Sequence, residues 1–193
     1  MKIIKVEKTV FKTLKFPELR HKNTWIAGGA IRDIIAGENF NDIDVYACNE
    51  EAFQIFHENL INCKVLFNNN IVKTFDFYGQ KLQLIKRYFP NPEECLMAFD
   101  YTICQFAYDG EFIYFNPESL LHLGRKALVV NNLQKGFEVD SLRRLLKYVK
   151  RGYTICNGGL MDLVTAFSKM SESDIKQQTE FYPDGSVKIQ RWD

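Results

Sequence analysis

The residues best suited to chemistry lie between positions 28 and 44. Gly28 and Gly29 precede Arg32, and Asp42 and Asp44 stand two residues apart in the segment DIDVYA. Side chains two apart on a strand project from the same face, so the two carboxylates converge and repel each other unless a cation lies between them. Such oxygen ligands suit Mg²⁺, which takes one or two protein carboxylates and completes its shell with water and phosphate oxygens.

The glycine pair predicts a phosphate-binding loop. Two glycines that open a helix let a ligand approach the backbone, and the free N–H groups at a helix start attract phosphate. We expect Gly28 and Gly29 to bind a triphosphate, with Arg32 contacting it or supporting the loop. Phosphate facing a metal held by two aspartates suits the transfer of a nucleotidyl group, because the metal activates the attacking hydroxyl and neutralises the leaving pyrophosphate.

Local patterns predict the elements that position these residues. Apolar residues at helical spacing predict a helix over 30–36 that stops at Gly37, and polar–apolar alternation predicts a strand over 42–48. Asn49, followed by two glutamates, is typical of an N-cap and predicts a helix to about residue 60.

Further along the chain, two hairpins are predicted. The first joins strands 72–78 and 81–86 at positions 79–80, and the second joins 103–108 to 111–115 at an Asp-Gly turn. A short strand over 2–6 completes an α+β arrangement, for which we expect a mixed, twisted sheet with helices on one side.

After position 117 the chain becomes mostly helical. The segment VDSLRRLLKYVKRGY predicts an amphipathic helix with Leu142, Leu145, Leu146 and Val149 as its apolar stripe. We divide the chain into a head domain, 1–117, and a helical neck-like region, 118–193, with a short C-terminal strand.

Composition narrows the class of protein. The 193 residues carry a formal net charge of +1, so any nucleic-acid contact must come from locally clustered lysines and arginines. Five cysteines without a C-x-x-C pair fit reduced thiols, and no segment has the length or apolar character of a signal peptide or membrane span. We therefore expect a cytoplasmic protein with no membrane partner.

The ordered motif GGAIRDIIAG…DIDVY resembles the head-domain signature of the polymerase-β-type nucleotidyltransferases, in the branch of bacterial poly(A) polymerases and CCA-adding tRNA nucleotidyltransferases. FDYTICQFAYDG, YFNPESLLHLGRKALV and VDSLRRLLKYVKRGYTI resemble later motifs of that branch in the same order, so the likeness covers roughly residues 24–170.

That resemblance implies a nucleotidyltransferase head followed by a helical neck, and a transfer of a nucleoside monophosphate (NMP) from ATP or CTP to an RNA 3′ end. It implies two Mg²⁺ ions at Asp42 and Asp44, ribose contact by Asp100, and recognition of the base by Asp140 and Arg143.

The departures from the family pattern concern charge. Gln83 stands where the family has a third carboxylate, and Ala98-Phe99 replaces a pair of arginines. We expect Asp76 to compensate by facing Gln83 across the first hairpin.

These departures leave alternatives open. The acceptor is a protein or small molecule instead of RNA, or the chain is a catalytically impaired descendant that binds nucleotide or RNA. In a further alternative, a protein partner or a second copy of the chain supplies an RNA-binding surface. The basic run Arg143, Arg144, Lys147, Lys150 and Arg151 is either a solvated helix face or a track for RNA or triphosphate.

Overall fold

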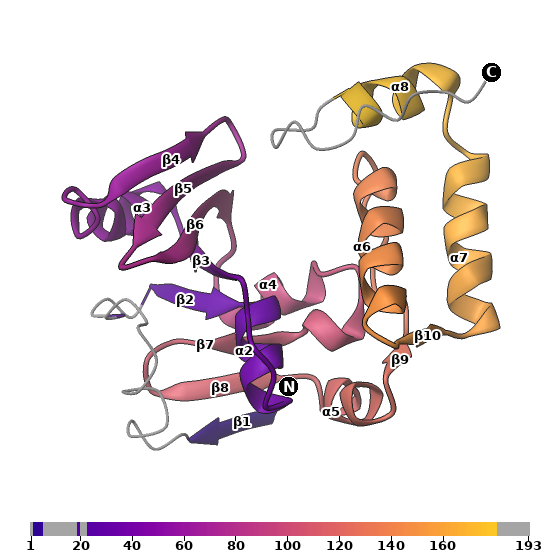
Figure 1. Cartoon of the computed structure of the whole chain (residues 1–193), viewed down its shortest axis with the longest axis horizontal. Coiled ribbons are helices and arrows are strands. Elements are labelled where there is room, and N and C mark those ends of the chain that lie inside the picture. Colours follow the sequence, from indigo (N-terminus) through magenta and orange to yellow (C-terminus); the bar gives the residue numbers. More distant parts are fainter. Residues whose placement is uncertain (1, 6–18, 20–22, 181–193) are drawn as a thin grey trace.

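The computed structural model describes residues 2–5, 19 and 23–180, so the strand expected near the C-terminus lies outside the described residues. Its main feature is an eight-stranded sheet with the order β1-β8-β7-β2-β3-β6-β5-β4 (Figure 1). The strands are β1 Lys2–Lys5, β2 Thr24–Ala27, β3 Asp42–Ala47, β4 Lys64–Asn68, β5 Val72–Phe77, β6 Gln80–Tyr88, β7 Phe106–Tyr108 and β8 Phe112–Phe115. β3 and β6 run parallel while the other neighbours are antiparallel, which confirms a mixed sheet in an α+β fold.

The helices divide between the sheet and a group beyond it. The helical elements are α2 Gly29–Ile35, α3 Glu50–Glu58, α4 Pro92–Met97, the short 3-10 turn η1 Thr102–Cys104, α5 Pro117–Gly124, α6 Glu138–Lys150, α7 Asn157–Ser168 and α8 Glu172–Glu180. A two-stranded parallel pair, β9 Ala127–Leu128 and β10 Thr154–Ile155, joins the ends of α5 and α6 to the following segments. Within the described residues, no helix has both the length and the apolar character that crossing a membrane requires.

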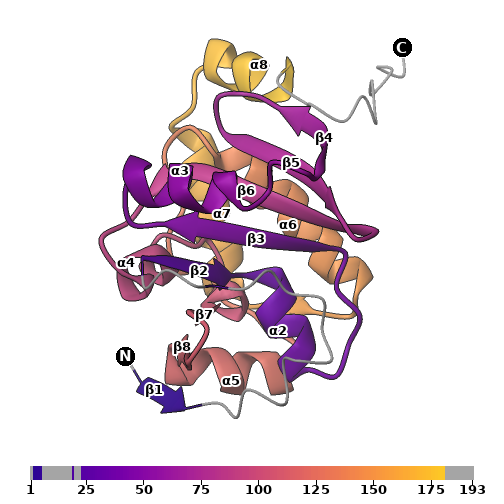
Figure 2. The ribbon, with the colours of Figure 1, turned by 90° about the vertical axis from the view of Figure 1, so that its left-hand side faces the viewer.

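Both sheet faces carry helices, so the expectation of helices on one side was wrong. α2 and α3 bury Ile31 and Phe53 in a core that includes Ile26 of β2. Trp25 of β2 and Leu96 of α4 belong to a separate cluster. The reason is the period of the strand: Trp25 and Ile26 are neighbours on β2 and must point to opposite faces. Figure 2 shows α4 and α2 at different positions along the sheet.

The β5–β6 hairpin turns one residue earlier than we expected. Tyr78 and Gly79 both have positive φ, 53° and 83°, as in the tight two-residue turns whose twist matches the strands. Asp76 is consequently paired with Lys81, and its Oδ1 accepts a hydrogen bond from Gly79 N at 2.8 Å. The expectation that Asp76 compensates for Gln83 was therefore wrong, because Gln83 pairs with Thr74.

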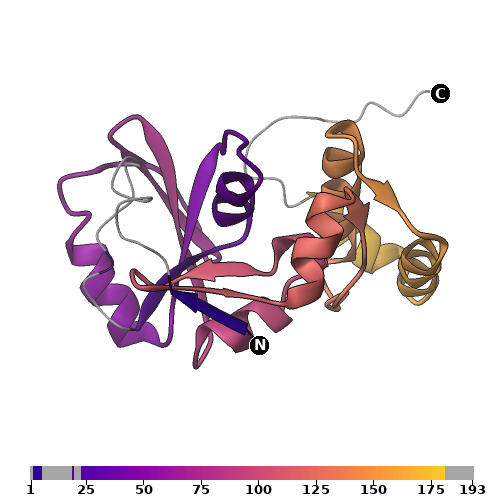
Figure 3. The same ribbon diagram turned by 90° about the horizontal axis from the view of Figure 1, so that it is seen from below.

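The neck helices lie beyond one end of the sheet, as the view from below shows (Figure 3). The predicted stripe of α6 is half right: Leu145 is buried and Leu142 packs against the core, but Leu146 and Val149 are 55% and 47% exposed. The inward face instead includes Ser141 and Tyr148, because α6 packs against polar groups of the head. Leu145 and Tyr148 join the same core cluster as the buried residues of α2 and α3.

Candidate nucleotide-binding and catalytic site

A pocket of about 410 Å³ lies between the sheet and α6 and brings together most of the predicted site. Gly28, Gly29, Arg32, Asp42, Asp44 and Asp100 all line it. They come from the N-cap of α2, from α2 itself, from β3 and from the segment after α4, while α6 closes the opposite side. Motifs separated by more than seventy residues in the sequence therefore meet at one cavity.

Asp42 and Asp44 lie on one face of β3, both half-buried, while Ile43 and Val45 point into the core. Burial and the neighbouring charge of Asp42 raise the pKa of Asp44 to about 7, and Lys147 and Arg144 oppose that shift. The pair is thus destabilised as two anions unless positive charge approaches it. Lys147 and Arg144 supply part of that positive charge from α6.

The glycine loop lies directly against this pair. Gly28 has φ 88° and ψ −131°, a region that favours glycine, and its N–H donates to the Phe106 carbonyl at 2.8 Å. A Cβ added at Gly28 would lie 3.4 Å from the Phe99 ring and 3.9 Å from Asp44 Oδ2. The backbone at Gly28 therefore borders the carboxylates, and a side chain there would narrow the pocket.

Arg32 is committed to contacts within the protein. It is 2% exposed, its Nε donates to Asp33 Oδ1 at 2.7 Å, and its Nη1 donates to Tyr148 Oη at 2.9 Å. Burial lowers the pKa of Arg32, but Tyr148, Cys104 and Asp33 outweigh it and raise the pKa above its ordinary value. We expected Arg32 either to contact the triphosphate or to support the loop. The geometry favours support of the loop, because the hydrogen bond from Arg32 to Tyr148 ties α2 to α6.

Asp100 is similarly engaged. Its Oδ2 accepts from Arg144 Nε at 2.6 Å, its Oδ1 accepts from Tyr101 N at 3.0 Å, and the residue is 6% exposed. Asp100 therefore fixes an arginine of the neck at the pocket. Arg144 itself keeps 44% of its side chain exposed and remains accessible to a ligand.

The basic run on α6 divides between two sides of the helix. Arg144, Lys147 and Arg151 line the pocket, together with Arg87 at the end of β6. Arg151 also ties α6 to the head, since its Nη2 contacts Asp33 Oδ1 at 2.9 Å and Glu38 Oε2 at 2.6 Å. The sequence identified the run but not its inward members, and nothing in the local sequence marked Arg87.

Asp140 and Arg143 point elsewhere. Arg143 Nη1 lies 3.4 Å from Asp140 Oδ1, an i,i+3 pair along α6, and Asp140 lines a second pocket. The residues of α6 and its C-cap that line the first pocket are Ser141, Arg144, Lys147, Tyr148 and Arg151. Ser141 and Arg144 each follow Asp140 and Arg143 by one residue and so lie on a neighbouring face of the helix. Recognition of the base by Asp140 and Arg143 stays a prediction that this geometry does not favour.

The carboxylates fit Mg²⁺, although with a sparse ligand set. Gln83 is the register partner of Asp44 on the parallel strand β6 and lines the same pocket. Within the part of the chain that the structure describes, no group of three or more Asp, Glu, His or Cys side chains could hold a metal. A two-carboxylate site suits Mg²⁺, whose remaining ligands are water and phosphate oxygens.

The fold is similar to those of solved CCA-adding enzymes and of a tRNA nucleotidyltransferase. It superposes on the Thermotoga maritima CCA-adding enzyme complexed with tRNA with a TM-score of 0.64 at 15% identity, covering 93% of this chain and 50% of that chain. A CCA-adding enzyme with CTP gives 0.62 at 16% identity, with 93% and 51% covered. A tRNA nucleotidyltransferase complexed with a primer tRNA and an ATP analogue gives 0.59 at 15%, with 90% and 54% covered. At such identity the likeness shows the fold, and the chain spans about half of each of these proteins.

The sequence family is narrower. The model of the Gabija anti-defense 2 (Gad2) family matches residues 3–126, and the chain belongs to this family. A curated relative from Bacillus phage SPbetaL7, "Gabija anti-defense 2", is 31% identical over 142 residues, which are 71% of this chain and 35% of the relative. The resemblance to CCA-adding enzymes thus holds for the fold, while the sequence family is Gabija anti-defense 2.

Proposed function

We propose that this chain is a metal-dependent nucleotidyltransferase that moves an NMP from ATP or CTP to a hydroxyl of a protein or small-molecule acceptor, in the service of Gabija anti-defense. The main observation behind this proposal is that Asp42 and Asp44 share one face of β3 beside the Gly28 backbone, in a pocket that Arg144 and Lys147 line from the α6 side. Acidic and basic groups meet there as a metal–triphosphate complex requires.

Each group in the pocket has a role in this reaction. The backbone at Gly28 and Gly29 carries no side chain and so leaves room for the triphosphate, and Arg144 and Lys147 neutralise its oxygens from the α6 side. Arg32 and Arg151 hold α2 against α6, which keeps these cations opposite β3. Precise placement matters because small displacements of reacting groups cost large factors in rate.

Asp42 and Asp44 would hold Mg²⁺, which supplies charge neutralisation at the phosphates and a lowered pKa of the attacking hydroxyl. The mutual repulsion of the two carboxylates supports this assignment, because it is relieved only by a cation or a proton. Arg144 and Lys147 offset only part of this repulsion, because the pKa of Asp44 stays raised in their presence.

Family membership directs the choice of acceptor. The structural relatives are described as tRNA enzymes, but the family is described by its action against Gabija, and its description names no RNA. Transfer to an RNA 3′ end therefore becomes the secondary possibility. A Gabija component, or a small molecule on which Gabija depends, is the acceptor that the family description favours.

A catalytically impaired nucleotide-binding protein is the competing function, favoured by one specific observation. Gln83 offers a neutral amide where it flanks Asp44, so the site has two carboxylates in place of three. Such a protein would bind metal and nucleotide without turnover.

The test is incorporation of label. The chain is incubated with Mg²⁺, each α-labelled NTP in turn, and either the purified proteins of a Gabija system, a small-molecule extract or total tRNA. The Asp42→Asn/Asp44→Asn protein is the negative control, and Asp162→Asn on the exposed face of α7 is the matched carboxylate control. Label on a protein or small molecule that needs both aspartates supports the proposal. Label on tRNA restores the RNA function, and NTP binding without label supports the impaired form.

A further inference from the structure

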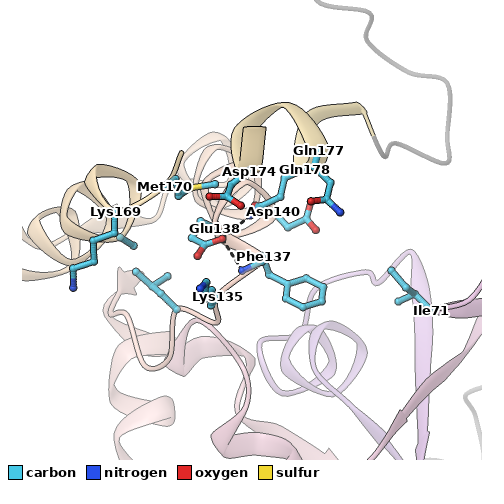
Figure 4. A pocket seen from close by; sticks show the side chains of 13 residues that line it. Ile71, Lys135, Phe137, Glu138, Asp140, Lys169, Met170, Asp174, Gln177 and Gln178 are labelled. Atoms are coloured by element: carbon cyan, nitrogen blue, oxygen red, sulfur yellow. Dashed lines mark hydrogen bonds between the residues drawn. The ribbon is translucent and has the colours of Figure 1, made fainter. Parts of the chain in front are cut away.

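A second pocket adjoins the first and has a different chemical character. It encloses about 640 Å³ between the loop before α6, the end of α7 and α8 (Figure 4). Ile71, in the β4–β5 loop, and Phe137, the N-cap of α6, line both pockets. The close-up shows these two side chains facing the space on the head side of the cavity. The two pockets therefore adjoin at these two side chains, and a molecule in the second pocket lies next to the first.

The two pockets differ in charge. The first is lined by five cationic side chains and four carboxylates, namely Arg32, Arg87, Arg144, Lys147, Arg151, Asp33, Asp42, Asp44 and Asp100. The second has two lysines, Lys135 and Lys169, against the three carboxylates Glu138, Asp140 and Asp174. Polyanions bind where lysines and arginines outnumber acids, so the first pocket suits a triphosphate and the second disfavours an RNA strand.

The remaining walls of the second pocket suit a peptide. Leu133, Phe137 and Met170 supply apolar surface, and the side-chain amide of Gln177 offers a donor and an acceptor of the kind a peptide backbone pairs with. Glu138 is held in place, because its Oε2 accepts from Gly136 N at 2.9 Å and from Gln178 Nε2 at 2.7 Å. α8 is thereby fixed to the start of α6, and the pocket is a built feature of the neck.

We propose that this second pocket binds the acceptor, and that the acceptor is a neutral or basic protein segment bearing a serine, threonine or tyrosine hydroxyl. The inference rests on the proposed function and narrows its acceptor to one class. Apolar residues of the segment lie against Phe137 and Met170, its basic groups face the carboxylates, and its hydroxyl passes Ile71 and Phe137 toward Asp42 and Asp44.

The transfer balances without any further reactant. The hydroxyl oxygen of the segment forms a bond to the α-phosphorus of the NTP, and the bond from that phosphorus to the bridging oxygen of pyrophosphate breaks. The hydroxyl proton passes to water, and pyrophosphate leaves with the bonding electron pair. The product is a protein segment carrying an NMP in phosphodiester linkage.

The test uses a matched pair of methionine variants. Met170→Trp fills the second pocket, while Met161→Trp places the same ring on the outer side of α7, where Met161 is 64% exposed. The probes are fluorescent synthetic serine-containing peptides in basic, neutral and acidic pools, and a single-stranded RNA oligonucleotide. Binding is measured by fluorescence anisotropy for the full chain and both variants, and NTP binding is measured separately.

The expected result is that basic and neutral peptides bind more tightly than acidic peptides or RNA. Met170→Trp should weaken peptide binding at least about tenfold and leave NTP binding unchanged. The indole ring takes up space that the peptide needs, and crowding of this kind costs enough binding free energy for a tenfold loss of affinity. Met161→Trp should behave as the parent protein. No binding by any peptide pool, equal binding by Met170→Trp, or a preference for RNA that Met170→Trp removes would each overturn the inference.

Labelling with α-labelled NTP separates this inference from the function on which it rests. Peptide binding that depends on Met170, with no label on any acceptor, leaves the peptide site standing and refutes the transfer. If Met170→Trp labels an acceptor as well as the parent protein does, the nucleotidyl transfer is supported and the peptide site is refuted.

Discussion

Gln83 lies beside Asp44 in register on the adjacent parallel strand, so a neutral amide borders the carboxylate pair of the candidate metal site. The two side chains line one pocket. A carboxylate in place of that amide would complete a set of three acids on two neighbouring strands. The affinity of the site for a divalent ion therefore depends on position 83.

Replacing Gln83 by Glu should tighten Mg²⁺ or Mn²⁺ binding, by about tenfold, because ligand charge count raises the affinity of oxygen sites for hard cations. Mn²⁺ binding followed by electron paramagnetic resonance measures it directly. Gln177→Glu, which adds the same charge in the second pocket, should leave the metal affinity unchanged. A Gln83→Glu protein with unaltered affinity would show that position 83 does not reach the ion.

The repulsion between Asp42 and Asp44 should appear in the stability of the metal-free protein. Asp44→Asn removes one of two half-buried like charges, so the free energy of unfolding at pH 8 without metal should rise by about 1 kcal/mol. Urea unfolding with and without Mg²⁺ checks this. Mg²⁺ should stabilise the parent protein and have little effect on the variant. Stabilisation of both proteins to the same degree would place the ion elsewhere.

The ion pair between Arg144 and Asp100 should contribute to both stability and nucleotide binding. Arg144→Met removes the side-chain donor of the buried Asp100 carboxylate and leaves it the Tyr101 N–H, at a cost of about 1–3 kcal/mol in the free energy of unfolding. NTP affinity should fall as well, since Arg144 lines the pocket. The double variant Asp100→Asn/Arg144→Met should recover part of the stability and none of the affinity.

Arg143 provides the neighbouring control. It is paired with Asp140 along α6 and should affect stability by less than about 1 kcal/mol when replaced by Met. A change in the preferred NTP on replacing Arg143, with none on replacing Arg144, would instead support the role in base recognition that the sequence motif implies.

The elements that the sequence predicted correctly are those specified by short-range periodicity. Asp42 and Asp44 alternate with core residues over six positions, and Asn49 caps α3 through a hydrogen bond from Ala52 N at 2.9 Å. Both signals are complete within a few residues. The order of the motifs then brought the glycine loop and the aspartates to one pocket.

What the sequence did not predict depends on contacts between distant segments. The β5–β6 register follows from a positive φ at Tyr78, a residue that carries no turn signal. The inward face of α6 is set by polar contacts such as Arg32 to Tyr148, so hydrophobic periodicity chose Leu146 and Val149 wrongly. Arg87 reaches the pocket only because β6 lies beside β3.

Gly28 offers the sharpest separation between the phosphate loop and the fold. Gly28→Ala should destabilise the protein by about 1–3 kcal/mol, because its backbone conformation is essentially restricted to glycine and the new Cβ would lie 3.4 Å from the Phe99 ring. NTP affinity should fall beyond what instability explains, since that Cβ enters the pocket next to Asp44.

Gly37→Ala is the matched control. Gly37 also has positive φ, 68°, but no heavy atom lies within 4 Å of a Cβ added there, and Gly37 does not line the pocket. Both variants should unfold at lower urea concentration, and only Gly28→Ala should lose NTP binding when measured by titration under conditions where it stays folded. Equal NTP affinity in the two variants would show that the Gly28 backbone does not contact the triphosphate, and the cations of α6 would then carry phosphate binding alone.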